Sequence, residues 1–410
     1  MRYVLCLLFA CFLLAALFPP ARAAAAEPDV DDAASAVNAF AIDIYRQLAA
    51  EGGNIFFSPY SISSALAMTY AGARGETAEE MADVLHFTGL GQDVHAAMGA
   101  LQHRFNAIPE EMGSLNIANR LWLDKRENLT PDFMALMKEF YGADAGVADF
   151  LNDYDTERVK INDWVARETR DRIRDLLQEG NVTPETILVL VNAIYFNAAW
   201  QVPFDRLLTR DEPFRTGRDE QHDVPMMNQT RFFRYGENSY AQLIKIPYEI
   251  PGLSMLILLP RENEDFTQME ELEKQLTHEA LASWRADMGF SRVTLRMPRF
   301  RDEQRYALGD VLQRLGMNLA FTASADFSGM VKEPRDGPPV HMDFVVHKAF
   351  IELDEERTEA AAATGIGISV TSARIEPEPI IEFNADRPFI YFIIDEETGL
   401  ILFMGRMEQP

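Results

Sequence analysis

The sequence predicts one α+β domain built around a large, partly mixed β-sheet. Apolar residues recur at three- and four-residue spacing through much of the first half, which is typical of amphipathic helices. The second half is rich in short alternating or continuously apolar runs, which are typical of strands. Elements of both kinds are mixed along all 410 residues without a repeat or a long linker, so we expect no boundary within the domain.

Several helices are expected in the first half. The first spans 37–48, and another begins at Ser58 with Pro59 in its first turn, where proline is favoured. Thr77 and Glu80 have the spacing of a capping box, in which two side chains satisfy the free N–H groups of a helix start. The expected helices after the second one cover residues 76–85, 92–107, 131–140 and 156–177.

The expected strands differ in how they are buried. Residues 115–123 alternate, whereas residues 186–196 are almost continuously apolar, as in a strand covered on both faces. Two runs, 389–394 and 400–405, flank a turn-like segment and predict a hairpin. Further strands are expected over 231–235, 241–247, 253–259, 291–300 and 343–353, with helices over 266–287 and 303–315 among them.

Residues 1–23 are predicted to be a secretory signal peptide rather than part of the fold. Arg2 precedes an apolar run over 3–18, and small residues at 21–23 offer a cleavage site. The run is shorter than the roughly 20 apolar residues that span a bilayer. A lipoprotein signal ending at Cys11 is the weaker alternative, because the apolar run continues past that cysteine.

The domain is then expected to cover residues 24–410 and to act outside the cytoplasm, in an extracellular or periplasmic space. The chain's two cysteines, Cys6 and Cys11, both lie in the signal segment, so neither disulfide nor thiol chemistry is expected in the domain. The formal net charge of −26 argues against binding nucleic acid or an anionic membrane by bulk electrostatics.

Motifs of the common enzyme classes are missing from the sequence. It contains no phosphate-binding G-x-x-x-x-G-K-[ST] loop, no G-x-S-x-G nucleophile elbow and no histidine pair at metal-ligand spacing. We therefore expect no cofactor, no metal and no catalytic activity. An exported hydrolase with a hidden carboxylate pair remains an alternative.

One segment, residues 355–371, combines the surroundings of a loop with the pattern of a buried strand. Even positions from 358 to 370 are small and then β-branched, while charged residues and prolines flank the segment. A strand over 358–370 would span about 43 Å, the length of a central strand in a large sheet. The pattern predicts a loop in one state and an inserted strand in another. The alternative is an alanine-rich surface helix, against which Gly365 and Gly367 argue.

A series of motifs in one order resembles the serpins over essentially the whole domain. They are NIFFSPYSIS at 54–63, LVNAIYF at 190–196 followed by Trp200, VPMM at 224–227, DFSGM at 326–330, VHKA at 346–349, EFNADRPF at 382–389 and LFMG at 402–405. The resemblance implies the serpin fold, which has three β-sheets, about eight to nine helices and an exposed reactive loop, here about 355–380.

The resemblance also implies a function. Serpins are suicide inhibitors of serine proteases: the protease cleaves the loop and is trapped as an acyl-enzyme while the loop inserts into the large central sheet. We therefore expect a monomeric inhibitor rather than an enzyme. The alternative is a non-inhibitory serpin with a carrier, chaperone or storage role, although the bulky or charged hinge residues common in such members are missing here.

The family's hinge and reactive bond fall in the same segment. The cleaved bond is expected at Thr371–Ser372, which suits an elastase-like protease, and Arg374 is the rival recognition residue for a trypsin-like one. Arg357 departs from the glycine usual at its position, which puts the speed of insertion in question. The expected hinge consists of Thr358, Glu359, Ala360, Ala361, Ala362, Ala363 and Thr364.

Other positions are expected to control the conformation of the sheet. The resemblance places Ser58, Ser61, Asn192 and His347 in the "shutter" beneath the opening sheet, and Trp200 in the "breach" at its top. His347 lies on an apolar strand face, and we interpret it as a buried, hydrogen-bonded histidine rather than a catalytic one. No strong heparin binding is expected, because residues 90–108 offer Arg104 and histidines alone as basic groups.

Overall fold

The computed structural model describes residues 29–109, 111–142, 145–217, 220–262, 268–332, 339–356 and 379–410. The predicted signal peptide, the hinge residues 358–364, and Thr371, Ser372 and Arg374 of the expected reactive bond lie outside these ranges. The description therefore covers the framework on either side of the expected loop.

The described residues contain nine α-helices and fourteen strands. The helices are α1 Val30–Ala49, α2 Pro59–Tyr70, α3 Gly75–Val84, α4 Val94–Asn106, α5 Pro131–Tyr141, α6 Phe150–Glu168, α7 Gln268–Gln275, α8 His278–Ala286 and α9 Gly309–Leu315. The strands are β1 Ile55–Phe57, β2 Gly113–Asp124, β3 Gly146–Ala148, β4 Leu188–Ala198, β5 Arg210–Arg215, β6 Gln221–Glu237, β7 Ala241–Pro247, β8 Leu253–Pro260, β9 Gly289–Pro298, β10 Phe300–Ala307, β11 Phe344–Leu353, β12 Ile381–Asn384, β13 Phe389–Asp395 and β14 Ile401–Met407.

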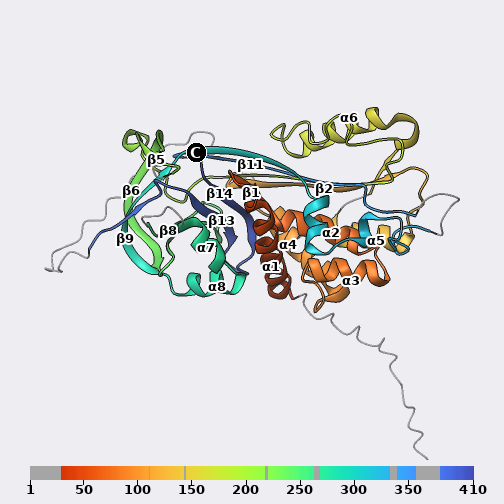
Figure 1. The fold of residues 1–410 in the computed structure, drawn as a ribbon, viewed down its shortest axis with the longest axis horizontal. Helices are drawn as coiled ribbons and strands as arrows, with labels where there is room; N and C mark the ends of the chain where they lie inside the picture. Colours follow the sequence, from red (N-terminus) through yellow and green to blue (C-terminus); the bar gives the residue numbers. More distant parts are fainter. Residues whose placement is uncertain are drawn as a thin grey trace, which may run out of the picture.

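Five strands form the large, partly mixed sheet that the sequence predicts. Their order is β10-β11-β4-β2-β3, with parallel pairing between β11 and β4 and between β2 and β3, and antiparallel pairing elsewhere. In Figure 1 its long strands β2 and β11 cross the upper part of the molecule, with α6 above them and α2 and α4 below. The central strand β4 is covered on both faces, which explains its continuously apolar sequence.

The other nine strands form one hydrogen-bonded network, in the order β1-β14-β13-β8-β7-β6-β9-β12 with β5 paired to β6. The 17-residue β6 joins its two sections, because one end pairs with β5 and the other with β7. The three sheets implied by the resemblance thus correspond to the five-stranded sheet and these two sections.

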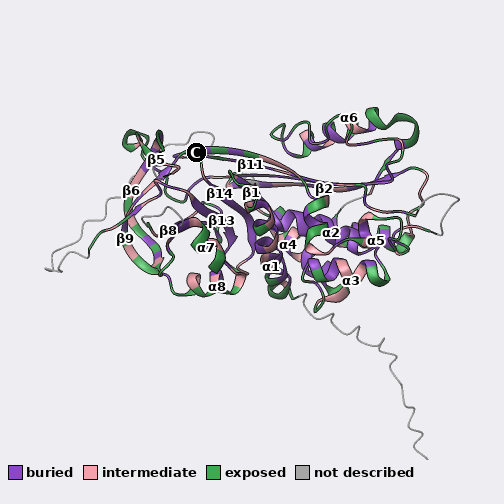
Figure 2. Ribbon diagram, viewed as in Figure 1, coloured by how far each residue is buried: buried purple, intermediate pink, exposed green. Residues whose placement is uncertain are grey.

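Two apolar clusters hold the central sheet between them. Val189 and Val191 of β4 and Val346 of β11 pack with Ile161 and Val165 of α6 on one face. On the opposite face, alternate residues such as Leu190 and Ile194 belong to the main core, which also contains α1, α2, β13 and β14. Figure 2 shows α2, β13 and β14 mostly buried, whereas α1 is only partly buried. Opening the sheet therefore disturbs packing on both sides.

Three helix predictions need correction. The helix expected over 156–177 runs over Phe150–Glu168, and Arg170, Asp171 and Asp175 then adopt positive φ angles that no α-helix tolerates. The helix expected over 266–287 is two helices, because the Thr277 side chain caps a new start at α8. The third is the helix expected over 303–315, whose first part is the edge strand β10. The pairing of β10 with β11 overrides the helical preference of its charged residues.

The capping box predicted at Thr77 and Glu80 is also wrong. Helix α3 starts without a side-chain cap. The Thr77 hydroxyl instead accepts a hydrogen bond from the Asp326 N–H, and Glu80 accepts from the N–H groups of Asn318 and Leu319. Both side chains therefore tie α3 to a segment some 240 residues away in sequence, which their spacing does not reveal.

Candidate functional site

Strands β4 and β11 pair directly and in parallel at the centre of the sheet. The register runs from Val189 opposite Phe344 to Tyr195 opposite Phe350. Because these strands hydrogen bond to each other, no strand lies between them along this length. Beyond Tyr195 and Phe350 the pairing ends, although both strands continue for three residues. The sheet is thus closed along most of its length and open at one end.

A row of polar side chains crosses the sheet at mid-height. Tyr306, His347, Asn192 and Asn119 lie in register on the four neighbouring strands β10, β11, β4 and β2. Asn119 is missed by the sequence reasoning, although a signal exists: it interrupts the apolar face formed by residues 115, 117, 121 and 123. A lone polar residue on such a face needs a buried partner.

His347 is completely buried and satisfied at both ring nitrogens. Its Nε2 accepts a hydrogen bond from the Ser58 N–H at 3.1 Å, so the ring proton sits on Nδ1, which donates to Oδ1 of Asn192. Burial lowers the pKa of His347 to about 3, and the ring is therefore neutral at physiological pH. These contacts match the interpretation of His347 as a hydrogen-bonded core histidine.

The start of α2 is bound to the same row. Ser58 caps the helix: its Oγ accepts from the Ser61 N–H at 3.1 Å and donates to the Leu402 carbonyl at 2.6 Å. The Ser61 hydroxyl accepts from Nδ2 of Asn192 at 2.6 Å and donates to Oδ1 of Asn119 at 3.1 Å. The structure thus brings Ser58, Ser61, Asn192 and His347 together, and Asn119 joins them.

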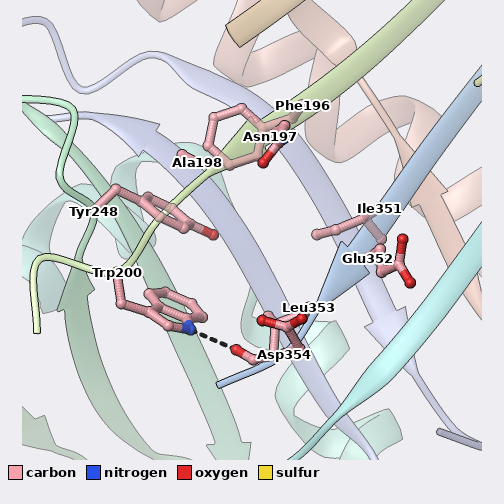
Figure 3. A pocket seen from close by; sticks show the side chains of 9 residues that line it. All are labelled: Phe196, Asn197, Ala198, Trp200, Tyr248, Ile351, Glu352, Leu353 and Asp354. Carbon is pink, nitrogen blue, oxygen red and sulfur yellow. Dashed lines mark hydrogen bonds between the residues drawn. The ribbon is translucent and has the colours of Figure 1, made fainter. Parts of the chain in front are cut away.

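Trp200 lies at the open end of the β4–β11 pair. Its Nε1 donates to the Asp354 carbonyl at 2.9 Å, and its ring stacks on Tyr248 with centroids 4.7 Å apart. Figure 3 shows the small pocket at this point, where the strands diverge and Trp200 reaches across to Asp354. The indole therefore links the segment after β4 to the segment after β11.

Hydrogen bonds and ion pairs hold the chain that follows β11 as far as Glu356. The Glu355 carbonyl accepts from the Phe204 N–H at 2.8 Å, and its carboxylate accepts from the Thr209 hydroxyl at 2.7 Å. Arg299 lies 3.7 Å from the Glu355 carboxylate, and Arg206 lies 3.5 Å from that of Glu356. Glu356, the last described residue before the expected hinge, thus lies near the open end of the β4–β11 pair.

Asp343, which precedes β11, joins the two strands at the opposite end. Its Oδ2 accepts from the N–H groups of Ile187 and Leu188 at 2.8 and 3.0 Å, and its own N–H donates to the Leu188 carbonyl at 3.1 Å. Sequence reasoning missed this residue, because an aspartate before a strand is common and its partners lie more than 150 residues away. The β4 and β11 segments are therefore joined at three points. Asp343 links them where the strands begin, His347 and Asn192 in the middle, and Trp200 at the open end.

Neither a metal centre nor a membrane span emerges from the described part of the chain. It holds no group of three or more histidine, cysteine or acidic side chains arranged to bind a metal ion. None of its helices has the length and apolarity needed to cross a bilayer.

Comparison with known proteins settles the family. The model of the family "Serpin (serine protease inhibitor)" matches residues 35–410. The chain belongs to the serpin family. Mouse leukocyte elastase inhibitor A is 41% identical over 392 residues, which cover 93% of this serpin and 100% of that protein. An uncharacterised serpin-like protein of Thermococcus kodakarensis is 40% identical over 379 residues, covering 92% and 85% of the two chains.

The solved structures confirm the predicted fold class. Uncleaved ovalbumin superposes with a TM-score of 0.80 at 29% identity, covering 92% of this serpin and 100% of ovalbumin. The α+β fold with several sheets expected from the sequence is thus the serpin fold.

Proposed function

We propose that this serpin is an exported suicide inhibitor of serine proteases, in which the segment 358–370 inserts between β4 and β11 after the protease has cleaved the loop. The family match and the relatives named leukocyte elastase inhibitor support protease inhibition. Export rests on the signal peptide predicted for residues 1–23, and the mechanism rests on the geometry of the β4–β11 pair.

The polarity of the strands carries the proposal. Strand β11 ends at Leu353 and leads within five residues to the expected hinge. A strand that reverses after β11 runs antiparallel to it, and also to β4, because β4 and β11 are parallel. Insertion therefore replaces one parallel ladder by two antiparallel ones. Antiparallel pairing is slightly more stable per residue than parallel pairing. The sheet also gains one additional set of strand-to-strand hydrogen bonds, so insertion is favourable.

The composition of the segment fits such an insertion. The 11 residues of β4 define the length of strand to be matched, and residues 358–370 are long enough to cover it. The first residues to enter, from Thr358 to Thr364, are small apart from Glu359. Small side chains pass between two strands that are packed on both faces with little steric or desolvation cost.

An elastase-like target is favoured over a trypsin-like one. The expected bond at Thr371–Ser372 presents Val370 and Thr371 to a small apolar specificity pocket, and the name of the 41% identical mouse relative agrees with this target class. Arg374 is the alternative recognition residue and fits a trypsin-like enzyme.

Mixing the serpin with one elastase-like and one trypsin-like serine protease tests the proposal. On a denaturing gel we expect a stable complex whose intact mass equals that of the protease plus the intact serpin minus the C-terminal peptide, which leaves when the acyl bond forms. That peptide begins at Ser372 if Thr371 is recognised and at Ile375 if Arg374 is.

The catalytically inactive protease, with its nucleophilic serine replaced by alanine, is the control and should give no such complex. Complete loop cleavage by both active enzymes without a complex, and without a rise in the melting temperature of the cleaved chain, would contradict inhibition. That result would favour the non-inhibitory alternative.

A further inference from the structure

A second pocket lies where β6 and β7 diverge, in the nine-stranded network. Strand β6 pairs with β7 from Arg234 to Glu237 and with β5 up to Met226, so among the described strands residues 227–233 pair with β9 only. The pocket, of about 420 Å³, opens beside this edge. Its lining includes Arg231, Phe232, Arg234, Lys245, Tyr248 and Phe290.

Two aromatic rings of this pocket are unusually exposed. Phe290 is 70% exposed and Phe232 is 55% exposed, and they are the only exposed phenylalanines among the described residues. Both lie on the same face of the β6–β9 pair, because Phe290 is opposite Arg234 and Phe232 is two residues before Arg234. Leaving two large apolar rings in water is unfavourable, and such a patch commonly marks a binding site.

Two guanidinium groups line the pocket, Arg234 on the face of the two exposed rings and Arg231 on the opposite face of β6. Arg234 lies over Phe290 with 4.9 Å between its Cζ and the ring centroid, and it donates to the Met288 carbonyl at 3.1 Å. Arg231 lies over Phe233, also at 4.9 Å. Burial lowers the pKa of the Arg231 guanidinium, which reflects the cost of holding a charge partly out of water.

Most of this positive charge is not neutralised. Lys245 forms an ion pair with Glu396, which also accepts a hydrogen bond from the Ser254 hydroxyl. In the part of the chain that the structure describes, neither Arg231 nor Arg234 forms an ion pair, and the exposed Glu249 on the rim pairs with neither. The lining has three basic and two acidic side chains, a net charge of +1 in a chain whose formal net charge is −26.

We propose that this pocket binds a small organic anion that carries a flat apolar group. The rings of Phe232 and Phe290 would cover the apolar group, and the guanidinium donors of Arg234, on the same face, would hold its carboxylate, sulfonate or phosphate. Arginine suits this role because its planar fork of donors matches such oxyanions. The pocket shares Tyr248 with the opening beside Trp200 but is otherwise separate, so this proposal stands independently of the inhibitory function.

The fluorescent aromatic sulfonate 8-anilinonaphthalene-1-sulfonate is a suitable probe for the intact serpin. We expect one probe molecule to bind per chain, with an affinity that falls as the salt concentration rises. The uncharged analogue N-phenyl-1-naphthylamine has the same rings without the sulfonate, and we expect it to bind about tenfold more weakly or worse, since charge-assisted hydrogen bonds contribute about 1.5–3 kcal/mol.

Three single variants locate the site. We expect Arg234→Gln to weaken sulfonate binding about tenfold and Phe290→Ser to weaken both probes, with unchanged melting temperatures because both side chains are exposed. Arg167→Gln is the matched control: it removes the same charge from an exposed position on α6 outside the pocket, and it should leave binding unchanged. Equal effects of Arg234→Gln and Arg167→Gln, or equal affinity for the two probes, would overturn the proposal.

Discussion

His347 on β11 and Asn192 on β4 face each other across the central parallel pair and are joined by a hydrogen bond between Nδ1 and Oδ1. This bond is the middle one of three links between the two strand segments. Asp343 forms the lower link with the N–H groups of Ile187 and Leu188, and Trp200 forms the upper one with the Asp354 carbonyl. Any strand that enters between β4 and β11 has to break all three.

Replacing His347 by alanine should loosen the middle link. The change leaves the buried Ser58 N–H and the Asn192 carbonyl oxygen without their partner and creates a cavity, for which we expect a loss of about 2–5 kcal/mol in the free energy of unfolding. Chemical unfolding followed by fluorescence measures this loss, and a native gel should show faster conversion to the loop-inserted form.

Tyr306→Phe is a suitable control for that variant. It lies in the same row and loses only the hydroxyl that accepts from the Phe56 N–H at 3.3 Å, so we expect a cost below about 1.5 kcal/mol. Equal destabilisation by His347→Ala and Tyr306→Phe would argue against a special role of the His347–Asn192 link.

Asp343→Ala should weaken the lower link. The N–H groups of Ile187 and Leu188, two buried residues, lose their shared acceptor, so we expect a loss of about 1–3 kcal/mol in the free energy of unfolding. Asp343→Asn keeps a neutral acceptor and should retain about half of this energy. His341→Ala separates this effect from the contact between Nε2 of His341 and Oδ1 of Asp343, which are 3.4 Å apart. If His341→Ala alone reproduces the loss, the assigned role of Asp343 is wrong.

Stability should decrease as the pH falls below about 6.5. Burial lowers the pKa of His347 to about 3 and that of His95, whose Nδ1 lies 2.8 Å from the Tyr141 hydroxyl, to about 4. The unfolded chain therefore takes up protons near pH 6.5, whereas the folded chain does not. Each histidine then costs up to about 1.4 kcal/mol per pH unit below that point.

Urea unfolding at pH 7.5 and pH 5.0 measures this dependence. His95→Gln and His347→Gln should each reduce the difference between the two pH values, because each removes one buried titrating ring. An unchanged difference in both variants would mean that other groups, such as the many carboxylates, govern the acid sensitivity.

A charged hinge should abolish trapping without abolishing cleavage. Ala360→Arg places a long cation in the segment that has to enter a sheet packed on both faces, where an unpaired charge is strongly unfavourable. We expect at least a tenfold higher ratio of cleaved to complexed serpin on denaturing gels. Ile380→Arg, beyond the expected cleavage site, is the control and should leave the ratio unchanged; trapping by Ala360→Arg at the wild-type ratio is the contrary result.

The sequence predicted an element well where its residue pattern reflects burial in the core. It predicted an element less well where pairing with a strand distant in sequence decides the conformation. The apolar run at 186–196 identified the doubly covered β4, and the Ser58-Pro59 start of α2 was confirmed because its cap is local in sequence. The strand β10 was mistaken for a helix, since its charged residues are stabilised by the neighbouring β11 rather than by their own preference.

In the candidate site, too, some residues were predicted from the sequence and others were missed. The resemblance brought out Ser58, Ser61, Asn192, His347 and Trp200, and the structure places the first four in one hydrogen-bonded cluster. Asn119 and Asp343 went unnoticed, because their partners are set by the register of strands that are distant in sequence. The hinge residues and the bond at Thr371–Ser372 stay predictions.

Locking the β4–β11 pair tests the central claim most directly. Ile194 and Ala349 lie opposite each other, and neighbouring strands are about 4.8 Å apart, within the range that a disulfide spans. The domain from residue 24 onward contains no cysteine of its own, so Ile194→Cys combined with Ala349→Cys gives a single reducible cross-link. If the loop inserts between these strands, the oxidised variant will be cleaved by the protease without forming a stable complex, and reduction will restore the complex. Equal complex formation in the oxidised and reduced states would contradict insertion at this position.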